Sequence, residues 1–120
     1  MVENSRQHLR ESINLLVQAN LAVRSQLVDN ERLLAEALAQ IDAGVAVEDI
    51  LSAMPTVEER TANIEAVQKF YARRSDVRAA AIRAALDEGT NVSELAEAFG
   101  LPHETIVSHA VEAASEVDHR

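Results

Sequence analysis

Apolar residues in the first third of the chain recur at alternating intervals of four and three positions. The pattern begins at Leu9 and reaches Ile41 with no proline or glycine inside it. Because this interval averages 3.5 residues, the positions lie along one narrow side of a helix, as in coiled coils and helical bundles. The sequence therefore predicts one long helix that ends near Gly44. The predicted seam consists of Leu9, Ile13, Leu16, Asn20, Val23, Leu27, Asn30, Leu34, Ala37 and Ile41.

The apolar stripe of this helix is wider than the seam alone. It is broadened by Val17, Leu21, Val28, Leu33 and Leu38. A wide stripe indicates a bundle with more than one neighbouring helix, and we expect the helix to form a homodimer. The predicted oligomerisation residues are Leu9, Ile13, Leu16, Asn20, Val23, Leu27, Leu34 and Ile41. Asn20 and Asn30 either fix the register of that assembly or lie at its edge in water, and the sequence leaves both interpretations open.

The middle of the chain contains two helix signals. Residues 47–55 predict a short segment of one or two helical turns that ends at a proline. Thr56 and Glu59 then have the spacing of a capping box, so a new helix is expected to begin there. Ser75-Asp76 can cap a further helix, and the sequence leaves open whether residues 56–88 form one helix or two.

The last third of the chain has the pattern of a helix, a tight turn and a second helix. A capping box of Asn91 and Glu94 begins the first of these helices. Gly100 stands where a left-handed backbone is wanted, and the small Ala96 allows two helices to cross closely. Ile106 can pack the second helix back onto the first. The positions that carry the pattern are Leu95, Ala96, Gly100, Leu101, Ile106 and Ala110.

This segment resembles the helix-turn-helix unit of bacterial DNA-binding regulators, including LuxR-type domains and region four of sigma factors. The resemblance implies a tri-helical fold in which residues 77–86 belong to the first helix. It also implies that the last helix enters the major groove of DNA with its N-terminal residues against base edges. The base-contacting candidates that follow are His103, Glu104, Thr105, Ser108 and His109.

Charge is distributed unevenly along the chain, whose formal net charge is −9. Residues 60–83 carry six basic and two acidic side chains, whereas residues 84–120 carry one basic and eight acidic ones. The segment that resembles a DNA reader therefore lacks Lys and Arg, and phosphate contacts are expected from the preceding helix. The candidates are Arg73, Arg74, Arg78 and Arg83. The alternative is that these arginines pair with acidic residues of the N-terminal helix or lie on a solvated face.

Several classes of site are not expected. The chain has no cysteine, and the two histidines of H-E-T-I-V-S-H are six residues apart, so they do not have the spacing of a zinc-protease motif. His8 and His119 lie near the ends of the sequence and are expected in water. No nucleophile stands beside a base and no glycine-rich phosphate loop occurs, so we expect no enzyme, no metal and no cofactor. No run of 18 apolar residues occurs, which favours a cytoplasmic protein.

The sequence thus predicts an all-α protein with two parts. Residues 1–74 are expected to form a helical oligomerisation region, and residues 75–120 a helix-turn-helix domain. The favoured function is a transcriptional regulator or nucleoid-type factor that binds double-stranded DNA as a homodimer. The alternative is a protein–protein adaptor or assembly factor whose acidic helix-turn-helix docks a partner such as RNA polymerase, or a protein similar to the small subunit of phage terminases.

Overall fold

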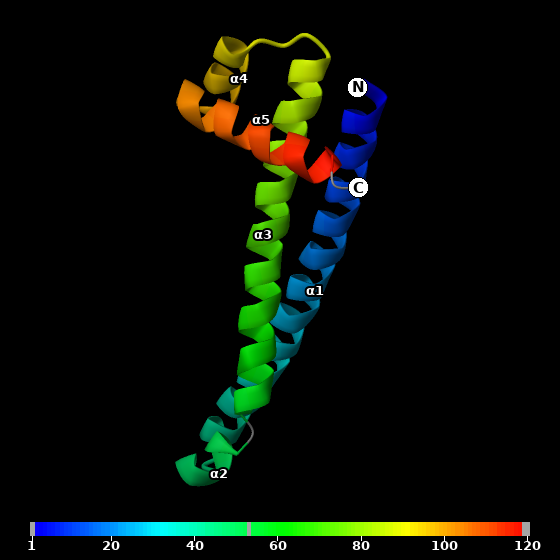
Figure 1. Cartoon of the computed structure of the whole chain (residues 1–120). Coiled ribbons are helices and arrows are strands. Elements are labelled where there is room, and N and C mark those ends of the chain that lie inside the picture. The colour runs from blue at the N-terminus through cyan, green and yellow to red at the C-terminus, as the bar shows by residue number, and fades with distance from the viewer. Residues whose placement is uncertain (1, 53, 119–120) are drawn as a thin grey trace. The chain divides into compact units, whose positions relative to one another are not determined.

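The computed structural model describes residues 2–52 and 54–118, and every regular element in this part of the chain is a helix. The elements are α1 (Val2–Asp42), α2 (Val47–Leu51), α3 (Val57–Asp87), α4 (Val92–Phe99) and α5 (His103–Asp118) (Figure 1). This confirms the predicted all-α class and the long N-terminal helix. None of the helices described combines the length and the apolarity that crossing a lipid bilayer requires.

The ends of α1 and α3 follow from local chemistry. Gly44 adopts a φ of 78°, and the amide of Val45 donates to the carbonyl of Gln40 at 3.0 Å, which closes the last turn of α1. At the start of α3, the amide of Glu59 donates to Thr56 Oγ1 at 3.1 Å, and the amide of Thr56 donates to Glu59 Oε2 at 3.2 Å. The predicted capping box is therefore formed in full.

The helix that begins at Val57 continues without a break to Asp87. The sequence left open a second helix start at residues 75 and 76. Asp76 is instead an internal residue of α3, and its carboxylate accepts a hydrogen bond from Arg73 one turn earlier, at 3.5 Å. Because the carboxylate is oriented towards a side chain of its own helix, it caps no new one.

The chain forms two compact units, which we describe separately. The hairpin unit is Gln18–Phe70, and the terminal unit combines Met1–Val17 with Tyr71–Arg120, within the residues described. Both units contain part of α1 and part of α3. The division of the chain that the sequence predicted, between residues 74 and 75, remains a prediction.

In the hairpin unit, the chain reverses direction between α1 and α3, with α2 at the reversal (Figure 1). Asn63 Nδ2 donates to Asn30 Oδ1 at 3.5 Å, and Gln26 Nε2 donates to the carbonyl of Ala62 at 3.4 Å. The buried apolar residues described in this unit are Ala19, Ala37 and Ile50. The unit therefore has a small core for its length.

Only half of the predicted seam of α1 is buried within one chain. Leu9, Leu16, Val23, Asn30 and Ala37 are buried or half-buried, whereas Ile13, Asn20, Leu27, Leu34 and Ile41 are exposed. The second row of sheltered positions on α1 is Ser5, Ser12, Ala19, Gln26, Leu33 and Gln40. Small and polar side chains dominate this row, so a search for large apolar residues did not find it. The small side chains of this row allow α3 to approach α1 closely.

Candidate nucleic-acid interface

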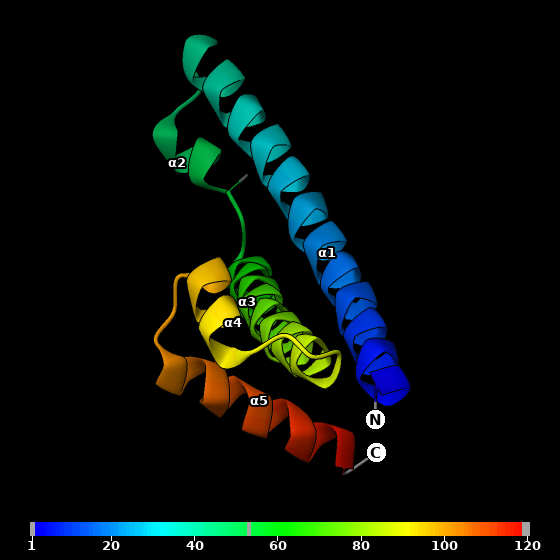
Figure 2. The ribbon, with the colours of Figure 1, turned by 90° about the horizontal axis from the view of Figure 1, so that it is seen from above.

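The candidate interface is built on an apolar cluster shared by three helices of the terminal unit. Ile82 of α3, Leu95 and Ala96 of α4, and Ile106 of α5 form the cluster, and both isoleucines are 0% exposed. The helices α4 and α5 lie beside the C-terminal part of α3 (Figures 1 and 2). Partly buried residues pack around it: Ala85, Leu86, Val92 and Leu101. The cluster fixes the two short helices against the C-terminal part of α3.

The start of α4 is fixed by a side-chain cap. Asn91 has an extended backbone, and its Oδ1 accepts a hydrogen bond from the amide of Glu94 at 2.9 Å. This is the bond that the first half of a capping box requires. Because the cap satisfies an amide that has no partner within the helix, it stabilises the first turn of α4.

Replacing this cap gives a direct test of its contribution. We expect Asn91→Ala to lower the free energy of unfolding by about 1 kcal/mol, because the amide of Glu94 loses its acceptor. Urea denaturation followed by circular dichroism measures the change. Ser93→Ala, in the same helical turn and exposed, is the matched control and is expected to change stability by less than about 0.5 kcal/mol. Equal losses in both variants would contradict the assignment of the cap.

The turn between α4 and α5 depends on one glycine and one proline. Gly100 adopts a φ of 64°, in the left-handed region that favours glycine, and the amide of Leu101 donates to the carbonyl of Ala96 at 3.0 Å. Pro102 precedes α5 and offers no side-chain cap, but its carbonyl accepts from the amides of Thr105 and Ile106 at 3.1 and 3.2 Å. These two bonds begin the helix.

The predicted base-contacting residues lie in the first two turns of α5. His103, Glu104 and Ser108 are exposed, whereas Thr105 and His109 are half-buried. Two apolar residues missing from the prediction share the exposed side: Val107 is 50% exposed and Val111 is 64% exposed. Their spacing from Glu104 places them on one face of the helix. The side chain of Ala110, which contributes to the sequence pattern, lies outside those described.

The four arginines predicted to contact phosphates do not form one surface. Arg73 pairs with Asp76 at 3.5 Å, and Arg83 pairs with Asp87 at 3.4 Å, both within α3. Asp87 also accepts a hydrogen bond from Ser5 of α1. These two guanidinium groups are therefore engaged inside the chain, mostly with acids of their own helix.

The other two arginines are exposed and share a side of α3. Arg74 and Arg78 are four residues apart, which places them one turn from each other. The guanidinium of Arg74 lies over the ring of Tyr71, 5.8 Å from its centre. Arg78 precedes the buried Ile82 by one further turn, so this side of α3 continues towards the apolar cluster.

The N-terminal end of α1 contributes buried polar residues that the sequence did not indicate. Ser5, His8 and Ser12 are buried, and His8 is only 6% exposed. The expectation that His8 lies in water is therefore wrong, because the first turns of α1 pack against the rest of the terminal unit. His119 lies outside the described residues. A 3-4 spacing of small polar residues is the signal that would have identified this contact.

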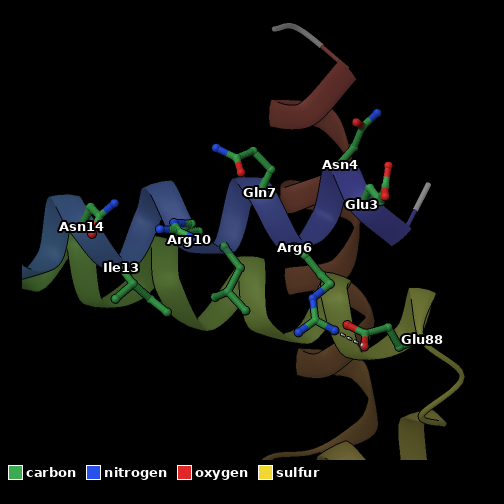
Figure 3. A pocket seen from close by; sticks show the side chains of 9 residues that line it. Glu3, Asn4, Arg6, Gln7, Arg10, Ile13, Asn14 and Glu88 are labelled. Atoms are coloured by element: carbon green, nitrogen blue, oxygen red, sulfur yellow. Dashed lines mark hydrogen bonds and ion pairs between the residues drawn. The ribbon is translucent and has the colours of Figure 1, made fainter.

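A pocket opens beside the first four turns of α1 (Figure 3). Arg6 points towards α3, where its guanidinium pairs with Glu88 at 2.8 Å, whereas Glu3, Asn4 and Gln7 point away from α3 (Figure 3). The remaining lining residues are Leu9, Arg10, Ile13 and Asn14. The described residues hold no cluster of three or more potential metal ligands. The pocket is therefore lined by one surface ion pair, between Arg6 and Glu88, and otherwise mainly by polar side chains of α1.

Comparison of the chain with protein-family models, with curated proteins and with solved structures found no match.

Proposed function

We propose that this protein is a non-enzymatic DNA-binding regulator or nucleoid-type factor that acts as a homodimer. In this proposal, the C-terminal part of α3 together with α4 and α5 forms a helix-turn-helix, and α5 enters the major groove. The observation that carries the proposal is the shared cluster of Ile82, Leu95, Ala96 and Ile106. It packs α4 against α5 across a tight glycine turn and leaves the first turns of α5 exposed.

The accessible charges support an interface that grips the DNA backbone more than it reads bases. Of the four candidate arginines, Arg74 and Arg78 are the exposed ones, and arginine suits phosphate contacts. On α5, Ser108 and Thr105 can donate to phosphates, while Lys and Arg, which commonly contact guanine, are missing. We therefore expect weak sequence preference and an affinity that depends strongly on salt.

The double variant Arg74→Ala/Arg78→Ala tests this interface. We expect the slope of log affinity against log salt to fall by roughly two per chain, because each arginine releases one condensed counterion on binding. Fluorescence anisotropy with a labelled duplex, measured between about 50 and 200 mM salt, gives the slope. Arg10→Ala/Arg32→Ala is the control, since it removes the same charge from exposed positions of α1.

Two results would overturn the proposal. One is that no duplex is retained by the unaltered protein at low salt. The other is that the control double variant weakens binding as much as the Arg74/Arg78 variant, because net charge alone would then explain the affinity.

A second candidate function is favoured by the surface of α4 and α5. Phe99, Val107 and Val111 are exposed large apolar residues on helices that carry no Lys or Arg. An apolar and acidic surface suits a protein–protein adaptor that docks a basic protein or RNA polymerase. Co-sedimentation with purified RNA polymerase tests this hypothesis. The unaltered protein is compared with Val107→Asp. Binding to polymerase that Val107→Asp abolishes, without binding to duplex, would favour the adaptor.

A further inference from the structure

The hairpin unit exposes a continuous set of large apolar side chains, which we call the apolar face. Its nine members are between 39 and 67% exposed: Leu21, Leu27, Val28, Leu34, Leu38, Ile41, Val57, Ile64 and Val67. Six come from α1 and three from α3. They include the predicted seam residues Leu27, Leu34 and Ile41, which are left exposed when α3 packs on the other row of α1.

The α1 members and the α3 members of the apolar face lie on the same side of the hairpin unit. Seen down the axis of α1, the exposed apolar positions are centred roughly a third of a turn from the row that contacts α3. The rotation from that row to the apolar positions is in the sense of increasing residue number. On α3, the exposed apolar positions lie at a similar rotation from the row that contacts α1, which contains Asn63. This rotation is again in the sense of increasing residue number. Because the helices run in opposite directions, rotations of the same sense bring both stripes to one face.

The area of the apolar face matches what a protein interface requires. Nine half-exposed apolar side chains, with the exposed Arg24 and Glu31 among them, amount to on the order of 800 Å², the area that one partner buries in a stable interface. Within the described residues of the unit, Ile50 is the one large apolar side chain that is buried. A partner on the apolar face would give this unit the core that two helices cannot supply.

Four of the six α1 members of the apolar face are placed symmetrically about the midpoint between residues 27 and 28. Leu27 and Val28 flank this point, and Leu21 and Leu34 lie at equal distances on either side of it. Arg24 and Glu31 also lie at equal distances from it. A second α1, packed antiparallel about that midpoint, places apolar residues opposite apolar residues. It also places each Arg24 opposite the Glu31 of the other copy, whereas parallel packing in register would oppose like charges.

Two of the three α3 members of the apolar face are also placed about a midpoint, and that midpoint lies at the same level. Ile64 and Val67 lie at equal distances from the midpoint between residues 65 and 66. Asn30 lies two and a half residues after the midpoint of α1, and Asn63 lies two and a half residues before the midpoint of α3. The hydrogen bond between Asn30 and Asn63, at 3.5 Å, sets these two positions side by side on antiparallel helices. One two-fold axis can therefore run beside both helices at the level of the two midpoints.

We infer that the apolar face binds a second copy of this chain, so that the two hairpin units form an antiparallel four-helix bundle. The two-fold axis lies between the two hairpin units, perpendicular to their helices. It is level with the midpoint between Leu27 and Val28 of each α1 and with the midpoint between residues 65 and 66 of each α3. Arg24 pairs with Glu31 of the other copy on both sides of the axis. This inference deepens the homodimer in the proposed function and rests on it, but it does not depend on DNA binding.

Cysteine cross-linking tests the register, because the chain has no cysteine of its own. Full-length chains with Arg24→Cys and with Glu31→Cys are mixed, dissociated in denaturant, refolded together and oxidised. We expect the disulfide-linked dimer of the two different chains to be the main product, since the two α-carbons can come within the roughly 4.4–6.8 Å that a disulfide needs. The matched control is the mixture of Ser25→Cys with Arg32→Cys, which are exposed on the polar side of α1 and have the same spacing.

Three outcomes would overturn the inferred register. The first is efficient cross-linking of Arg24→Cys chains to each other, which indicates a parallel pair. The second is equal cross-linking in the control mixture. The third is no linked dimer in any mixture.

A charge inside the apolar face tests the surface independently of any disulfide. We expect Leu27→Glu/Leu34→Glu to sediment as a monomer at micromolar concentrations at which the unaltered protein sediments as a dimer. Both positions are exposed in one chain, so the helical circular dichroism signal should be retained. Ala22→Glu/Glu36→Gln, on the polar side of α1, is expected to remain a dimer. A monomeric unaltered protein, or a dimer that the Leu27/Leu34 variant leaves intact, would refute the surface.

The failures of the two proposals can be told apart. If the Arg24–Glu31 cross-link forms but no duplex is bound, DNA binding alone is wrong. If duplex is bound by a dimer that does not form this cross-link, the register alone is wrong.

Discussion

Replacing Ile106 with alanine is expected to lower the free energy of unfolding by about 2–5 kcal/mol. Ile106 is fully buried in the cluster that joins α3, α4 and α5, and truncating it leaves a cavity among Ile82, Leu95 and Ala96. Because α4 has only 8 residues, it has few other contacts with which to close around that cavity. Urea denaturation at one fixed protein concentration measures the loss, since dimerisation makes stability depend on concentration.

The neighbouring residue supplies the control for this prediction. Val107 is 50% exposed in the same turn of α5, and Val107→Ala is expected to change stability by less than about 0.5 kcal/mol. If Ile106→Ala is as mild as Val107→Ala, the three-helix cluster does not hold the segment together. Ile106→Ala should also abolish duplex binding, because α5 would lose its fixed position on α3.

Replacing Ala80 with leucine is the second change with a large expected effect. Ala80 is fully buried in α3, on the side that also carries Ala84 and Asp87, whose carboxylate accepts from Ser5. The small residues of α1 on the opposing side leave no room for a larger side chain. We expect overpacking to cost about 1–3 kcal/mol, or the first turns of α1 to separate from α3.

Two measurements check this second prediction. Urea denaturation gives the stability, and hydrogen exchange of the first turns of α1 shows whether they separate from α3. Ala72→Leu, at an exposed position of the same helix, is the control and should leave both measurements nearly unchanged. Normal protection in α1 together with unchanged stability for Ala80→Leu would mean that the helices are not in close contact at this position.

The sequence predicted the helical elements well because their signals are local. The capping boxes at Thr56 and Asn91 and the glycine at residue 44 act within a few residues of the helix ends that they determine. The apolar positions Leu95, Ala96 and Ile106, chosen from their spacing, meet in one cluster with Ile82. Whether this arrangement is used to bind DNA is a separate matter, because a fold does not establish a function.

The contacts between distant segments could not be read from the same patterns. The 4-3 spacing of α1 described a stripe with two rows and did not say which row faces α3. The structure buries one of these rows at least in part, and beside it a further row outside the stripe, with Ser5, Ser12 and Ala19, whose small side chains permit the closer approach. Similarly, the charge count placed Arg73 and Arg83 in a basic segment, but Asp76 and Asp87 occupy both of them within the helix. Unlike the contacts of α1, these two pairs are local, with spacings of three and four residues, and a count of charges per segment takes no account of spacing.

The hydrogen bond from Ser5 to Asp87 also has a consequence for how the chain folds as it is synthesised. It joins residues 82 positions apart, so the first turns of α1 leave the ribosome long before their partner does. The contact between α4 and α5 is local and forms without that delay, whereas the N-terminal contact closes a large loop late. Until then, the small polar face of α1 is exposed to water, where serines and a histidine are less prone to aggregate than leucines would be.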